Sequence, residues 1–186
     1  MAIFNPTRTE IIAALRDIRY EIEALLQNPK HDPRDEAIVE TVYFRKMAHA
    51  RALHTFFTGT ASKRHKKDVL SEDYLFPASP IYSDDKSQSL IDRFNQDLFH
   101  ISYSRLQRTS ADKAWPMEEM LPPIIDRSKQ FIAHLLALEW QDIPPTELQK
   151  WRDMQDKRFV FRHLAQSTSN IADSQIASVE IHVRGI

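Results

Sequence analysis

The chain of 186 residues contains no cysteine and only two glycines, Gly59 and Gly185. Without cysteine it has no disulfide, thiol nucleophile, zinc ribbon or iron–sulfur cluster. Glycine-rich phosphate loops and hairpin-rich β folds both need backbone at positive φ, for which two glycines are too few. The composition therefore argues against nucleotide-binding folds of the Rossmann or P-loop type.

A strong net charge and long apolar runs are also missing. The formal net charge is −1, so no overall basic field draws the protein to nucleic acid, and any phosphate binding has to come from a local patch. No run approaches the roughly 18 apolar residues that cross a bilayer. The first residues do not resemble a signal peptide either. We therefore expect a cytoplasmic protein that does not contact a membrane.

Apolar residues recur at three- and four-residue steps through most of the chain, which predicts an all-α fold. Gly59, at the end of the second predicted helix, is expected to adopt a left-handed cap. We expect a four- to five-helix antiparallel bundle with a long polar loop between helices 2 and 3. The predicted helices cover about residues 6–28, 33–58, 86–107, 116–140 and 145–157.

The C-terminal tail and the loop after the second helix differ from the helical pattern. Residues 1–160 are predicted to form the helical bundle, and residues 161–186 are predicted to form an extended or partly disordered tail. Within this tail, residues 178–183 alternate apolar and polar side chains like a strand. The loop after the second helix carries the basic run 63–67, which either leads RNA to a site or is a solvated surface. Ser71 and the two acids after it are well suited to start a short turn.

Arg93 and His100 lie seven positions apart in the predicted third helix. On a straight helix this spacing leaves them about 20° out of alignment and about 10 Å apart along the axis. Arg93 could hold a phosphate and His100 could move a proton, because arginine keeps its charge and histidine titrates near neutral pH. The same spacing is typical of two boundary residues with structural roles. The candidate substrate-binding residues are Asn95, Asp97, Ser104 and Arg105 in the same helix, and Arg51 and His54 in the second.

Histidines on three predicted helices raise a metal-site alternative. His49, His54, His100 and His134 could converge in a bundle core. No pair has the close His-x₃-His or Glu-x₂-His spacing of well-defined sites. Packed or surface histidines explain the pattern equally, so no metal ligand is assigned.

Three segments together resemble a group of bacterial helical proteins similar to the wider HEPN superfamily. They are DRFNQDLFHISYSR at 92–105, ALHTFF at 52–57 and DVLSEDY at 68–74. The resemblance implies a homodimer whose motif helices face each other and that cleaves RNA without a metal or other cofactor. His100 would act as general acid/base, and Arg93 would stabilise charge on the phosphoryl oxygens.

Two hypotheses follow for Arg93 and His100. A metal-independent ribonuclease, acting in stress or defence, requires both side chains to be partly exposed and to converge across a two-fold axis. A non-catalytic helical interaction module, with a protein partner, is favoured if both are buried within one subunit.

Overall fold

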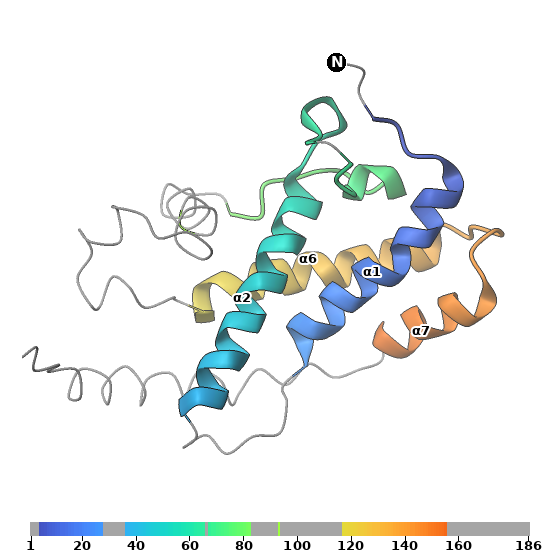
Figure 1. Ribbon diagram of the computed structural model, residues 1–186. Helices are drawn as coiled ribbons and strands as arrows, with labels where there is room; N and C mark the ends of the chain where they lie inside the picture. Colours follow the sequence, from blue (N-terminus) through green and yellow to red (C-terminus); the bar gives the residue numbers. More distant parts are fainter. Residues whose placement is uncertain (1–3, 28–35, 66, 83–92, 94–116, 156–186) are drawn as a thin grey trace, which may run out of the picture.

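A computed structural model of the chain describes residues 4–27, 36–65, 67–82, 93 and 117–155 (Figure 1). This part contains four α-helices and two short 3₁₀ turns and, within these ranges, no strand, which confirms the all-α prediction. The predicted third helix, except Arg93, and the predicted tail lie outside the described residues. The elements are α1 (Arg8–Leu26), α2 (Glu36–Thr58), η1 (Ala61–Lys63), η2 (Ser71–Tyr74), α6 (Met117–Ala137) and α7 (Pro145–Gln155).

The start of α1 is fixed by a capping box and by a contact with the far end of the chain. The Glu10 backbone N–H donates to Thr7 Oγ1, and the Thr7 backbone N–H donates to the Glu10 carboxylate at 2.8 Å. The Arg8 guanidinium makes two hydrogen bonds of 2.7 Å to Asp142 and lies 3.4 Å from the ring centroid of Trp140. The N-terminus of α1 is thereby tied to the turn between α6 and α7.

The helices pack as a hairpin crossed by a third helix (Figure 1). α1 and α2 run in opposite directions beside each other, and α6 lies across both, with α7 returning on the side of α1. α6 continues through Pro122 and Pro123, although proline removes the N–H groups that would bond to the carbonyls four residues earlier. Pro122 and Pro123 therefore lie inside α6 rather than at its start.

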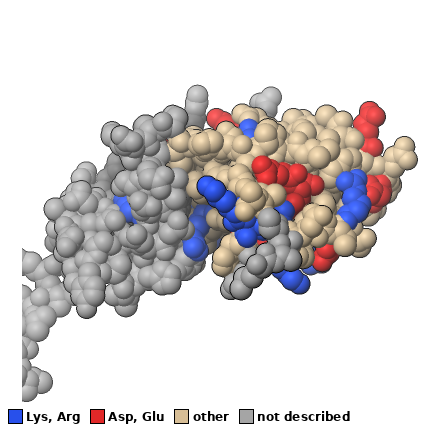
Figure 2. Space-filling model, turned by 90° about the horizontal axis from the view of Figure 1, so that it is seen from above, with Lys and Arg blue, Asp and Glu red and all other residues tan. Residues whose placement is uncertain are grey.

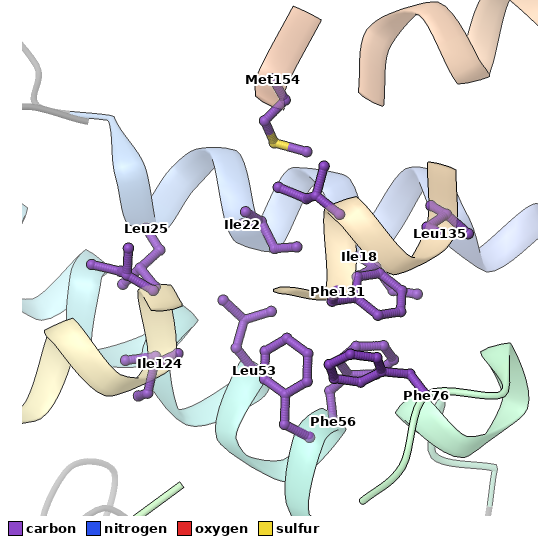
Figure 3. Close-up of a cluster of buried hydrophobic side chains, with 14 of the residues drawn as sticks. Ile18, Ile22, Leu25, Leu53, Phe56, Phe76, Ile124, Phe131, Leu135 and Met154 are labelled. Atoms are coloured by element: carbon purple, nitrogen blue, oxygen red, sulfur yellow. The ribbon is translucent and has the colours of Figure 1, made fainter. Parts of the chain in front are cut away.

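The core is apolar and rich in aromatic rings, and Phe131 of α6 lies at its centre (Figure 3). Its ring meets those of Phe56 and Phe76 edge-on, at centroid distances of 5.1 and 5.5 Å. All four helices and the residues after η2 contribute side chains to this core. They include Ile18, Ile22, Leu25, Leu53, Ile124, Leu135 and Met154.

The segment between α2 and residue 82 is more than a polar loop. Tyr74 is fully buried; its hydroxyl donates to the Ile11 carbonyl at 2.7 Å, and its own carbonyl is 3.0 Å from His134 Nε2. Leu70 and Phe76 are buried on either side of it. η2 begins at Ser71 as the sequence predicts. η2 and the residues that flank it therefore form part of the core, which polarity alone did not indicate.

The predicted left-handed cap at Gly59 is wrong, because its φ is not positive. Glycine is needed there for a different reason. A Cβ atom at this position would lie 2.6 Å from Leu70 Cδ2 and 2.9 Å from the Thr55 carbonyl oxygen. The absent side chain lets the residues before η2 approach the end of α2.

Within the described ranges, none of the helices combines the length and apolar character required to cross a bilayer.

Candidate functional site at the end of α2

His54 lies on the last turns of α2 and is the best-defined of the predicted substrate-binding residues. Its imidazole ring stacks on the Tyr82 ring, with centroids 5.8 Å apart and planes 14° from parallel. The Nε2 atom is buried and has no hydrogen-bond partner. A buried polar atom without a partner is uncommon in folded proteins and calls for an explanation.

Burial lowers the pKa of His54 to about 4 from its ordinary value near 6.5. Charging an imidazole that is largely removed from water costs free energy, and no neighbouring carboxylate offsets this cost. His54 is therefore neutral at physiological pH. A neutral ring nitrogen without a partner can accept a proton or a hydrogen bond.

Tyr82 closes a segment that we call the strap, residues 76–82. The Tyr82 hydroxyl donates to the Met120 carbonyl at 2.7 Å, just before the two prolines of α6. The Ser79 backbone N–H donates to the Phe57 carbonyl at the end of α2, at 3.1 Å. Arg127 of α6 donates to the Pro77 carbonyl and lies 4.1 Å from the Phe76 ring centroid. The strap therefore spans from α2 to α6.

Arg93 and Arg51 are the two candidate arginines among the described residues. Arg93 is helical and only 8% exposed, and it is engaged by other parts of the chain. Arg51 is half-buried on α2, one turn before His54, and is also engaged within the chain. The predicted site residues Asn95, Asp97, His100, Ser104 and Arg105 lie outside the described residues.

Comparisons with known proteins add no assignment: no family model, curated protein or solved structure matches the chain. The interpretation of this site therefore depends on the chain's own geometry and chemistry.

The described histidines have separate surroundings. His49 Nδ1 is 2.7 Å from a Glu21 carboxylate oxygen of α1, His54 stacks on the strap, and His134 contacts the Tyr74 carbonyl. Among the residues that the structure describes, no group of three or more histidine or acidic side chains is arranged to hold a metal ion. A metal site that included His100 is not tested by this result, because His100 lies outside the described residues.

The basic run 63–67 is divided by the fold. Arg64 is buried and paired with the Asp73 carboxylate, whereas Lys63, His65 and Lys67 are exposed. Acidic side chains lie close by, since Glu72 accepts a hydrogen bond from the Ala61 backbone N–H. Figure 2 shows both basic and acidic side chains on the face of the described residues that it draws. This favours the prediction of a solvated surface over that of a basic RNA track.

The sequence did not lead us to single out two residues that the structure shows to be important, Tyr82 and Lys46. Tyr82 was not singled out, although Ile81 and Tyr82 form an apolar pair in a polar, proline-containing stretch. Lys46 was also missed. It falls on the apolar stripe of α2, between Val42 and Leu53, and is 1% exposed. Its position on the apolar stripe could have indicated a buried lysine, because lysine is rarely found at core positions of a helix.

Proposed function

We propose that this chain is a HEPN-like helical interaction module, in which Arg93 serves the structure of the bundle. The observation that supports this proposal is the burial of Arg93, which is 8% exposed and engaged within the chain. An arginine that binds a substrate phosphate has to present its guanidinium donors to it. Withdrawing a buried cation from its partners to do so is costly.

A metal-independent ribonuclease is the second candidate. It is supported by the resemblance of residues 92–105 to the HEPN motif and by the neutral, unpartnered His54 on α2. In this scheme Arg93 stabilises charge on the phosphoryl group and His100 transfers the proton. Arg51 and His54 would contact the RNA, and a homodimer would bring two motifs together.

One experiment separates the two candidates. Purified chain is incubated with a mixed-sequence RNA in excess chelator, beside the variants His100→Ala and Arg93→Lys. We expect the same background cleavage from all three, because the interaction module has no catalytic pair. Chelator-resistant cleavage by the wild type that both variants lose, with unchanged melting temperatures, would establish the ribonuclease instead.

The stability of an Arg93 variant gives a second test of whether Arg93 is structural or catalytic. If it is structural, Arg93→Gln should lower the free energy of unfolding by about 3 kcal/mol or more, since the groups that it engages lose their partner. A catalytic arginine at an accessible site would tolerate this change within about 0.5 kcal/mol. Urea denaturation of the two proteins at pH 7.5 measures the difference.

The interaction partner that we propose first is a second copy of the chain. The resemblance to HEPN proteins implies a homodimer, and Phe44 of α2, which is 49% exposed, is the apolar side chain through which we test it. Light scattering should give the mass of a dimer at micromolar concentration. A Phe44→Glu variant that stays folded should shift the mass towards the monomer, and a wild-type mass of 21.8 kDa at all concentrations would contradict this assembly.

A further inference from the structure

At the C-terminal end of the strap, Ile81 and Tyr82 pack against the apolar core. The Tyr82 ring stacks on His54, and its hydroxyl bonds to the Met120 carbonyl. The backbone bond from Ser79 to Phe57 lies three residues earlier. Tyr82 is also where the chain leaves the described core towards Arg93.

We propose that His54 and Tyr82 form an acid-releasable anchor, in which protonation of the imidazole detaches the strap from α2 and α6. The neutral ring can stack on Tyr82 with its Nε2 atom buried and unpartnered. Protonation would add a second N–H donor and a positive charge to the imidazole in this buried position. The charged ring can be hydrated only if the strap moves away from it.

The surroundings of the ring do not compensate this charge. The described elements beside the ring carry titratable and charged groups, among them Arg51 on α2, Tyr82 on the strap, and Glu118, Glu119 and Arg127 on α6. None of them provides a hydrogen-bond partner for Nε2. Burial is the sole cause that lowers the pKa of His54, to about 4.

The sign of the effect follows from the pKa in the two states. With the strap attached the pKa is about 4, and with the ring in water it returns to about 6.5. The released state therefore binds more protons between these values, so attachment weakens as the pH falls from 6.5 towards 4. At neutral pH the anchor is intact. The inference does not depend on whether Arg93 belongs to a catalytic site.

The test measures amide hydrogen exchange at Ser79 by NMR in the full chain, with rates divided by the intrinsic rate at each pH. We expect the protection of Ser79 to fall about 20-fold between pH 7 and pH 5, from the difference in proton binding. The Ile18 amide in the core of α1 should stay more strongly protected than Ser79 at both pH values, because it exchanges only when the whole chain unfolds. His54→Phe and His54→Gln, which cannot be charged, should abolish the pH dependence at Ser79.

Two further variants separate anchoring from titration. Tyr82→Phe loses the bond to Met120 but keeps the ring, so Ser79 protection should fall by about 5-fold at both pH values. His65→Gln removes an exposed histidine of the same connection and should behave as the wild type. The proposal is overturned if Ser79 protection is independent of pH. It is equally overturned if Ser79 is as strongly protected as Ile18, which would mean that only global unfolding exposes it, or if the His54 variants retain the pH dependence.

Discussion

The Nζ atom of Lys46 donates a hydrogen bond to the carbonyl oxygen of Leu25 at 3.0 Å, joining the interior of α2 to the last turn of α1. This carbonyl is one of the terminal acceptors for which an α-helix has no internal partner. The amine is almost fully removed from water. Burial, and then the nearby Arg45, lower the pKa of Lys46 to about 8.

Lys46 should make the stability of the protein rise with alkaline pH. Its pKa is about 8 in the folded state and 10.5 in water, so the unfolded chain binds more protons between these values. The free energy of unfolding should therefore increase from pH 8 to pH 10, by up to about 3 kcal/mol. Above pH 10 the trend should reverse, because burial raises the pKa of Tyr43 to about 12.

Urea denaturation at pH 7.5, 8.5 and 9.5 measures this slope. Lys46→Met removes the titrating amine and should give a flat profile over the same range. Lys63→Met, at an exposed position, should keep the wild-type slope. A rise in stability that persists in Lys46→Met would show that another group is responsible.

Gly59→Ala should destabilise the protein by about 1–3 kcal/mol, because the new Cβ atom overlaps its neighbours. Trimming Leu70 to alanine in the same chain relieves only the side-chain overlap, so the contact with the Thr55 carbonyl remains. The thermal midpoint of each single variant and of the double variant measures the coupling. A Gly59→Ala protein as stable as the wild type is incompatible with this account.

The Arg64–Asp73 ion pair should behave as a buried pair. Both side chains are at least nine-tenths removed from water, and Asp73 also accepts from the Leu70 backbone N–H at 3.0 Å. Arg64→Met should cost about 3–5 kcal/mol, since it leaves a buried carboxylate without its partner. The double variant Arg64→Met/Asp73→Asn should lose clearly less free energy of unfolding than the sum of the losses in the two single variants. Denaturation of the four proteins in the cycle decides this, and strict additivity would refute the coupling.

Among the described residues, two that are not glycine occupy the left-handed region, Leu75 at φ 58° and Glu139 at φ 49°. Glu139 follows α6, where glycine is the usual residue. Glu139→Gly should therefore raise the stability by about 0.5–1 kcal/mol. Gln141→Gly, at an exposed position without positive φ, serves as the control and should lower it. Equal effects at both positions would mean that strain at Glu139 is absent.

The sequence alone determined the four described α-helices, because amphipathic periodicity and caps are local. The Thr7–Glu10 capping box and the proline-marked start of α7 could both be recognised from neighbouring residues. Arg93 and His54 could be named as candidates from their chemistry and position. Their surroundings could not, since burial is a property of the packed molecule.

Only the tertiary structure decided what distant residues do together. Tyr74 reaches Ile11 across 63 positions, and Arg8 reaches Asp142 across 134, distances over which no local pattern carries information. The same holds for Gly59, whose role comes from the approach of Leu70 rather than from its own backbone angle. The stacking of Tyr82 on His54 likewise follows from packing: it withdraws an imidazole from water and so sets its protonation state.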